Sequence, residues 1–361
     1  MPWTIKPISR LAECAEEWHS LNRAVSATPL LDFHFVQDVV SEFAAGEESI
    51  ATYHDNGVPR AIAILTRTNR FTWQTLQAPN APIGLWLCEP SSDVEALLRQ
   101  LAPALSPQCG LVSLTQQDPA LLARPDRSAH LSTLDYIVTP RLDFPDSFAT
   151  YLQGRSKNFR HNVTRQKNRL KRDNVTARLE FVTAAADMAM AVEDYSRLEC
   201  ASWKGEINSA VRMDEPQGRF YVTLMADFAA RGEGLVYRYF FGDRLVASDL
   251  CLRRNGTLII LKTACDETYQ GISTAHLMRL DAFAELLDKQ GIRTIEFYGP
   301  LKEWHTRLTD ATRQMYHVNY YRWQLVKFLH EFRIARHKDV PAGGADAPET
   351  PPAPTGADAA A

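Results

Sequence analysis

The segment 258–279 has the residue types and the spacing that bind a phosphate group. Residues 258–263 are mostly aliphatic or β-branched and predict a strand, and apolar side chains recur at helical spacing over residues 274–290. Between them, Tyr269, Gln270 and Gly271 indicate a turn. A strand that leads into a helix leaves backbone N–H groups unbonded where the helix dipole favours negative charge. The segment therefore predicts an anion site, although many α/β proteins have such a junction without a ligand.

The details of this junction narrow the ligand class. The turn has a single glycine instead of several, which argues against a loop for a nucleoside triphosphate. Ser273 or Thr274 is suited to cap the helix, and Gly291 is expected to end it. We therefore expect a phosphate group that belongs to a different kind of ligand.

Asp249 is a carboxylate in the middle of an otherwise apolar run, residues 245–252. The next predicted strand begins at residue 258, and Asn255-Gly256 between them is typical of a two-residue hairpin loop. This register places Asp249 directly opposite Lys262, where the two side chains would touch. The pair predicts either a cross-strand ion pair that fixes the register or a partly buried acid tuned for proton transfer.

A second polar group follows the predicted strand 294–298. Gly299-Pro300 breaks the chain directly after Tyr298, so the following side chains, Lys302 and His305 among them, can be presented at a cleft. Tyr298 or His305 could protonate a leaving group. The alternative is a surface turn with a solvated lysine.

Residues 148–172 predict a long basic helix that bridges two halves of the molecule. Three interpretations remain open for it: a solvated interdomain helix, a site for an anionic ligand such as CoA phosphates, a nucleotide-linked sugar or tRNA, or contact with an anionic membrane. The helix carries eight basic residues and no acid: Arg155, Lys157, Arg160, Arg165, Lys167, Arg169, Lys171 and Arg172.

Strand and helix signals occur in the same order twice, which predicts an internal duplication. We therefore predict a mixed α/β fold with two related domains, residues 1–140 and 141–337, the first of them degenerate. Residues 338–361 are rich in Pro, Ala, Gly and Asp, and this composition predicts a disordered tail. The predicted helices are 11–25, 31–43, 94–101, 188–203, 219–231 and 274–290, and the predicted strands are 49–52, 60–66, 71–76, 111–115, 235–241, 245–253, 258–264, 294–298 and 314–323.

Composition excludes several functional classes. The 361 residues carry 40 Lys and Arg against 43 Asp and Glu, so a uniformly basic coat for DNA is absent, and there is no recognition-helix motif. No signal peptide or apolar run of membrane-spanning length is visible, and the six cysteines form no Cys-x-x-Cys pair, so we expect a cytoplasmic protein. The histidine spacing predicts no metal site, and a Gly-x-Ser-x-Gly hydrolase elbow is absent.

Five segments together resemble a known family: residues 199–204, 245–252, 263–266, 271–277 and 297–304. The sequence resembles the GNAT superfamily, and more narrowly the bacterial branch with the CelD/BioF2-like acetyltransferases and the Fem-type aminoacyltransferases. The resemblance covers about residues 145–325 well and residues 1–140 weakly. It implies tandem GNAT-like domains with the catalytic one second.

The resemblance also implies a reaction: direct transfer of an acyl group from acetyl-CoA or another acyl-CoA to the amine of a small-molecule or envelope-precursor acceptor. Asp249 would accept the amine proton, Lys302 would stabilise the thioester oxyanion or hold an anionic acceptor, and Tyr298 would act as the acid. The thioester would lie against a splayed strand pair near residues 258–264. The residues implied to bind CoA are Gln270, Gly271, Ile272, Ser273, Thr274, Ala275 and His276, and those implied to bind the acceptor are Glu199, Trp203, Lys204 and Lys262.

Two alternatives remain. A Fem-like aminoacyltransferase would bind aminoacyl-tRNA on the helix 155–172 instead of CoA. A degenerate GNAT pair without activity would serve as a scaffold in envelope or exopolysaccharide assembly. The sequence departs from the superfamily pattern Q/R-x-x-G-x-G/A, because it has Gln next to Gly271 and Ser273 where a second glycine would stand.

Overall fold

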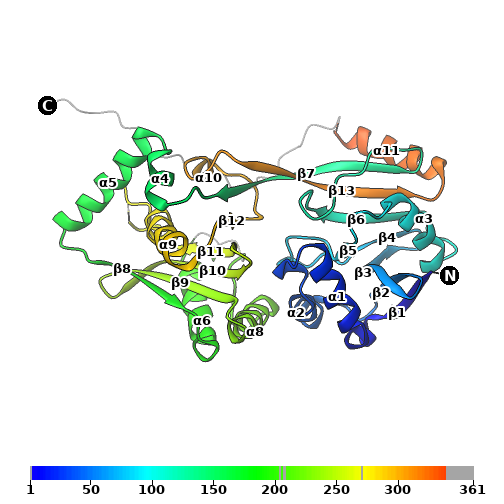
Figure 1. Cartoon of the computed structure of the whole chain (residues 1–361), viewed down its shortest axis with the longest axis horizontal. Helices are drawn as coiled ribbons and strands as arrows, with labels where there is room; N and C mark the ends of the chain where they lie inside the picture. The colour runs from blue at the N-terminus through cyan, green and yellow to red at the C-terminus, as the bar shows by residue number, and fades with distance from the viewer. Residues whose placement is uncertain (1, 203–204, 206–208, 270, 339–361) are drawn as a thin grey trace.

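The computed structural model describes residues 2–202, 205, 209–269 and 271–338. Trp203, Lys204, Gln270 and the tail from residue 339 onward therefore lie outside the described residues. Figure 1 shows two halves side by side along the long axis, joined by extended strands. None of the described helices combines the length and the apolar character needed to cross a bilayer.

The first half begins with a strand and two helices and continues with a strand meander. Its elements are β1 (Trp3–Pro7), α1 (Ala15–Val25), α2 (Phe33–Phe43), β2 (Ser49–Asp55), β3 (Val58–Asn69), β4 (Thr72–Thr75), β5 (Trp86–Cys88), α3 (Val94–Leu105), β6 (Leu111–Gln117) and β7 (Leu131–Asp143). Short 3-10 helices, Ile8–Cys14 and Pro29–Leu31, precede α1 and α2.

The second half repeats this order after two further helices, of which the second is basic. Its elements are α4 (Phe148–Gln153), α5 (Lys157–Arg172), β8 (Ala177–Val182), α6 (Met188–Cys200), α8 (Pro216–Ala230), β9 (Gly234–Phe241), β10 (Arg244–Arg254), β11 (Thr257–Cys265), α9 (Thr274–Gln290), β12 (Thr294–Glu296), α10 (Glu303–Thr306), β13 (Thr312–Tyr321) and α11 (Gln324–Lys338).

The strands of both halves form one mixed sheet in the described part of the chain. Its order is β1-β2-β3-β4-β6-β13-β7-β12-β11-β10-β9-β8, with β5 paired to β3. In the first half β4 and β6 are parallel and flank α3 in sequence, and in the second half β11 and β12 are parallel and flank α9. The equivalent pairings confirm the predicted duplication and the mixed α/β fold class.

The last strand, β13, follows the second half in sequence but pairs with strands of the first half. β13 lies between β6 and β7, and β7 in turn extends across to pair with β12. Each half thus receives a strand from the other, which is visible as the crossing of β7 and β13 in Figure 1. The predicted boundaries 1–140 and 141–337 are therefore wrong for β13, because its backbone hydrogen bonds are made with strands of the first half.

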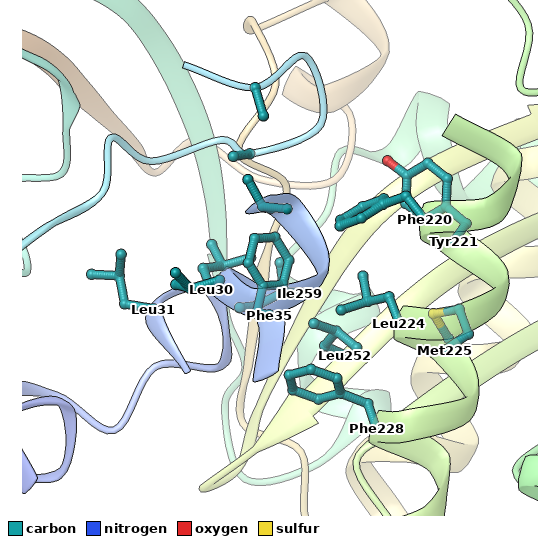
Figure 2. Packing of buried hydrophobic residues seen from close by; sticks show 14 of the residues in the cluster. Leu30, Leu31, Phe35, Phe220, Tyr221, Leu224, Met225, Phe228, Leu252 and Ile259 are labelled. Atoms are coloured by element: carbon teal, nitrogen blue, oxygen red, sulfur yellow. The ribbon is translucent and has the colours of Figure 1, made fainter. Parts of the chain in front are cut away.

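The two halves also share a hydrophobic core. Phe35 of α2 packs edge-on against Phe220 of α8, with 5.8 Å between ring centroids. Figure 2 shows these rings together with Leu224, Phe228 and Ile259 in one continuous cluster. Burial of these large side chains on both sides of the junction contributes to holding the halves in one orientation.

The predicted basic helix 148–172 is two helices, and it does not bridge the halves. Gly154 ends α4, and Ser156 begins α5 by accepting a hydrogen bond from the backbone N–H of Phe159. Figure 1 shows α5 at the end of the molecule farthest from the first half. The halves are bridged instead by β7 and β13.

Candidate active site

The parallel strands β11 and β12 separate after three residue pairs. They pair from Thr257 to Ile259, after which β11 continues to Cys265 while β12 stops at Glu296. A cavity of about 630 Å³ lies at this opening and is lined by both halves of the chain. The lining residues are 77–82, 116, 136, 137, 221, 259–262 and 297–300.

Tyr298 lines this cavity and is fixed by residues of the first half and of β13. Its hydroxyl donates a hydrogen bond to the buried carboxylate of Asp118 at 2.7 Å. Asp118 also lies 3.1 Å from the guanidinium of Arg313, which stacks over the Tyr298 ring. Burial and the nearby Asp118 raise the pKa of Tyr298 well above 10, so the phenol keeps its proton at neutral pH.

Lys262 lines the same cavity, but it does not face Asp249. The hairpin loop is Asn255-Gly256 as predicted, and the predicted register holds as far as Cys251 opposite Ile260. A β-bulge between Leu250 and Cys251 then shifts the pairing by one residue. Lys262 therefore lies opposite Leu250, and the predicted pairing with Asp249 is wrong.

Asp249 pairs with Arg279 of α9 instead. Two of the guanidinium nitrogens each lie 3.1 Å from a carboxylate oxygen, and the side chains are 0% and 2% exposed. Arg279 also donates to the hydroxyl of Thr263 at 2.6 Å and lies over the ring of Trp304. Because the carboxylate is sealed behind the strands, its geometry favours a role in positioning α9 against the sheet over direct contact with a substrate.

The loop before α9 is partly occupied by the protein's own side chains. The backbone N–H of Ser273 donates to the side-chain oxygen of Gln166 on α5, at 2.8 Å. The Ser273 hydroxyl does not cap the helix, because it contacts His276 Nδ1 at 2.6 Å. Burial, with the nearby Arg279 charge, lowers the pKa of His276 to about 4, so this histidine is buried and neutral.

Gly271 lies in the left-handed region, with φ +73°, and a guanidinium closely approaches it. A Cβ atom on Gly271 would lie 2.9 Å from Nη1 of Arg169. The positive φ and the close cation explain why a glycine stands here. The start of α9 therefore combines a helix dipole with an arginine, which is the electrostatic pattern of an anion site.

A wide groove of about 1340 Å³ surrounds the neighbouring face of α5. Its walls carry the guanidinium groups of Arg165, Arg169, Arg172 and Arg307. The complete lining is residues 156, 158, 159, 161, 162, 164–166, 168, 169, 172, 271 and 307. A groove of this size and charge is larger than a single diphosphate requires.

The other predicted catalytic residues do not join one site. Lys302 is exposed at the start of α10 and lines neither cavity. His305 is buried, its Nδ1 accepts from the Lys302 backbone N–H, and burial together with Arg279 lowers its pKa to about 3. Of the predicted residues, the structure brings together Tyr298 and Lys262, and it separates them from Lys302 and the sealed Asp249.

Glu199, predicted to lie at an acceptor-binding edge, is completely buried in α6. Its two carboxylate oxygens accept hydrogen bonds from the Tyr195 hydroxyl and the Val211 backbone N–H, each at 2.8 Å. This placement differs from the prediction, because a fully buried carboxylate has no surface for a substrate. Trp203 and Lys204 of the same prediction lie outside the described residues.

Three important residues were missed from the sequence: Asp118, Gln166 and Arg279. Gln166 had a signal, since it occupies the apolar stripe of α5 between Phe159 and Leu170. Asp118 and Arg279 are contributed by distant segments and carried no local signal. The described residues contain no cluster of three or more His, Cys, Asp or Glu arranged to hold a metal ion.

The corresponding helix of the first half begins with an acidic cap. This helix, α3, corresponds to α9 and is capped by Asp93, whose carboxylate accepts from the backbone N–H of Ala96 at 3.0 Å. A negatively charged cap occupies the helix N-terminus and repels an anion. The acidic cap of α3 is one way in which the first half differs from the second, and it agrees with the degeneracy predicted for the first half.

Comparisons with known proteins agree with this geometry. No curated protein matches the chain. Among solved structures, FemX superposes with a TM-score of 0.55 at 11% identity, covering 88% of this chain and 98% of that one. The C-terminal domain of a putative lysylphosphatidylglycerol synthetase from Agrobacterium fabrum gives 0.54 at 11% identity, covering 90% and 96%. At these identities the likeness is one of fold.

A second lysylphosphatidylglycerol synthetase structure, L-PGS from Bacillus licheniformis, gives a TM-score of 0.51 at 11% identity and covers 88% of this chain and 96% of that one. Residues 157–306 match the family model described as an acetyltransferase (GNAT) domain. This range includes the separated strands β11 and β12 and the loop before α9. Residues 157–306 thus match a GNAT acetyltransferase domain, and the fold of the whole chain is similar to that of FemX and of the two lysylphosphatidylglycerol synthetase structures.

Proposed function

We propose that this protein transfers an acyl group from a phosphate-bearing carrier to the amine of an acceptor held between its two halves. The observation that carries the proposal is the separation of β11 from β12, together with the start of α9, where Gly271 lies close to Arg169 of α5. An acyl group placed in the opening would meet an acceptor in the cavity of about 630 Å³. Holding the two reactants together supplies much of the rate without a covalent enzyme intermediate.

The first candidate for the carrier is acetyl-CoA or another acyl-CoA. Its diphosphate would lie at the start of α9, against the Arg169 guanidinium and the backbone of residues 271–276. The match of residues 157–306 to an acetyltransferase domain supports this donor. The bond between the acceptor nitrogen and the acyl carbon would form as the carbon–sulfur bond breaks, and CoA would leave as its thiolate, which takes a proton from solvent.

The acceptor cavity favours a polar amine of small-molecule size. Gln77, Gln116 and Tyr136 offer neutral hydrogen-bonding groups, and Lys262 adds a cation suited to a carboxylate or phosphate on the acceptor. This lining fits an amine-bearing small molecule or an envelope precursor. Both halves contribute lining residues, so the first half would form one wall of the cavity that holds the acceptor.

The proton released by the amine has a path through Tyr298. As the nitrogen attacks, its proton would pass to the phenol oxygen while the phenol proton passes to Asp118, 2.7 Å away. Asp118 thus replaces Asp249 as the final proton acceptor, and Asp249 positions α9 through Arg279. Lys302 would act only at the surface, on the approach of an anionic acceptor.

A second candidate carrier is aminoacyl-tRNA. Two observations favour it: the Ser273 N–H is already bonded to Gln166, and the groove of about 1340 Å³ beside it is lined by four arginines. A polyanion would engage such a groove with many phosphate contacts and a steep salt dependence. The cavity of about 630 Å³ and the proton path through Tyr298 would serve either donor.

Thermal shift of the purified protein with acetyl-CoA, longer acyl-CoAs and aminoacyl-tRNA tests the donor. A ligand at about 100 times its Kd stabilises by roughly 2.7 kcal/mol, which is readily visible. The variant Gly271→Ala should lose the acyl-CoA shift, because its Cβ would meet Arg169 Nη1 at 2.9 Å.

Gly242→Ala is the matched control. Gly242 also has a positive φ, +60°, but a Cβ there meets no atom within 4 Å. Both variants should lose similar stability, and only Gly271→Ala should lose the donor. A salt-sensitive shift with aminoacyl-tRNA alone would replace the first candidate by the second, and no shift with any donor would leave a scaffold without activity.

A further inference from the structure

The C-terminal helix α11 exposes an apolar face. Leu325, Phe328, Leu329 and Phe332 are 68%, 66%, 50% and 48% exposed, and their spacing places them on one side of the helix. The opposite side is anchored, since Lys327 donates a hydrogen bond to the backbone oxygen of Leu131 at 3.3 Å. The helix is therefore held on the first half with its large apolar side chains directed away from the protein.

Two exposed aromatic residues from neighbouring loops lie close to this helix. Trp323, directly before α11, is 45% exposed, and Phe71, directly before β4, is 49% exposed. They meet at Gly110, whose N–H donates to the Phe71 oxygen and whose missing Cβ would lie 3.1 Å from the Trp323 ring. We call Phe71, Trp323 and the four apolar residues of α11 the apolar edge. Figure 1 shows α11 at the outer side of the first half.

Arginine residues accompany both aromatic residues of the apolar edge. The guanidinium of Arg70 lies 4.8 Å from the Phe71 ring centroid, and that of Arg322 lies 5.1 Å from the Trp323 ring. An apolar face bordered by cations is the pattern of a helix that lies in the headgroup region of an anionic bilayer.

The charge also argues against other occupants. A second copy packed on the same face would bring the Arg70 and Arg322 guanidinium groups of two chains close together, and like charges repel. Residues 339–361 contain no aromatic residue and no Leu, Ile or Met, so this segment has no large apolar side chains to bury on the face. An anionic lipid surface satisfies both the apolar and the basic groups.

We propose that the apolar edge binds the surface of a membrane that contains anionic lipids. Leu325, Phe328 and Trp323 would insert among the headgroups, with Arg70 and Arg322 at the lipid phosphates. The cavity of about 630 Å³ is formed by other residues of the chain, so membrane binding and transfer are separable properties. Attachment would bring the enzyme to acceptors that are themselves bound to a lipid.

Sedimentation with vesicles tests this surface on the full chain. Wild type should bind vesicles of phosphatidylcholine mixed with phosphatidylglycerol, bind pure phosphatidylcholine weakly, and dissociate as salt rises. The double variant Leu325→Glu and Phe328→Glu should reduce binding by at least about tenfold, because each glutamate replaces an inserting side chain by an anion. Unchanged thermal unfolding would show that these exposed positions leave the fold intact.

Met190→Glu is the matched control, because Met190 is also 49% exposed but lies on α6 of the second half. It should bind the anionic vesicles as wild type does. The proposal is overturned if wild type does not bind anionic vesicles, or if the double variant binds them equally well. It is also overturned if wild type forms a dimer that the double variant dissociates, since the face would then be an interface between copies.

Discussion

The side-chain oxygen of Gln166 accepts a hydrogen bond from the backbone N–H of Ser273, across 2.8 Å. Gln166 is buried in α5, and Ser273 stands at the start of α9, where the second half would receive an anion. The glutamine is neutral, so the charge of Arg169 and the dipole of α9 still favour a phosphate there. In the proposed function, Gln166 would therefore compete with the donor for one hydrogen bond, while the charge of Arg169 and the dipole of α9 remain available to it.

Gln166→Ala should strengthen the binding of acetyl-CoA. The variant frees the Ser273 N–H, and one recovered hydrogen bond to a charged group corresponds to a Kd lower by about tenfold or more. Isothermal titration calorimetry measures this change. Asn168→Ala removes an exposed amide from the same helix and should leave the Kd unchanged. Weaker binding by Gln166→Ala would mean that the glutamine holds the donor site open instead of competing for it.

Tyr298→Phe should lower kcat by about 100-fold with little change in KM, because it removes the proton path and keeps the aromatic ring in the cavity. Asp118→Asn should act in the same direction, since an amide cannot accept the phenol proton. Steady-state kinetics with the donor identified by thermal shift would measure both effects.

Tyr136→Phe serves as the control for this prediction. Tyr136 lines the same cavity, and its hydroxyl accepts a hydrogen bond from Gln116 at 2.9 Å instead of contacting a carboxylate. It should affect KM more than kcat, as expected for a group that only contacts the acceptor. Equal losses of kcat in Tyr136→Phe and Tyr298→Phe would remove the proton path from the mechanism.

Local features of the fold could be predicted because their causes are local. The helix expected at residues 274–290 has those bounds in the structure, since an apolar stripe sets its face and Gly291, at φ +69°, ends it. The duplication was visible because each half repeats the same short signals. Gly271 could be identified as a turn residue because it stands between a predicted strand and a predicted helix.

Long-range pairing could not be predicted from these patterns. The bulge beside Leu250 changes the partner of Asp249 from Lys262 to Thr263, and nothing in the hairpin sequence marks it. The insertion of β13 between β6 and β7 depends on strands that are separated by more than a hundred residues in sequence. The ion pair of Asp249 with Arg279 arises only when α9 packs on the sheet.

This ion pair gives a prediction for stability. Asp249→Asn or Arg279→Met alone should lower the free energy of unfolding by about 3–5 kcal/mol, because each leaves a buried charge without its partner. The double variant Asp249→Leu and Arg279→Met should lose less free energy of unfolding than the two single variants lose together. Lys262→Met, at the position first predicted to pair with Asp249, should cost far less. Urea unfolding measures all four, and an equal loss in Lys262→Met would contradict the observed pairing.

Asp38 makes the junction of the halves sensitive to pH. It is only 7% exposed on α2, and burial together with the charge of Asp227 on α8 raises its pKa from 3.8 to about 7. Glu42 raises the pKa further, while Arg231 opposes the shift. The folded protein therefore holds a proton that the unfolded chain releases near pH 4. Stability from this group is fully present below pH 4 and is lost as the pH rises towards 7.

Asp38→Asn should therefore stabilise the protein at pH 8, where wild type carries a buried, ionised Asp38. The gain has an upper bound of about 4 kcal/mol, from the difference between the folded and unfolded pKa values, and it should shrink steadily as the pH falls towards 4. Thermal unfolding of both proteins across this range measures the difference. Glu42→Gln, a partner on the same helix, should give a smaller gain with the same sign. A stabilisation independent of pH would show that Asp38 does not titrate in this range, because only a proton bound differently by the two states makes the difference change with pH.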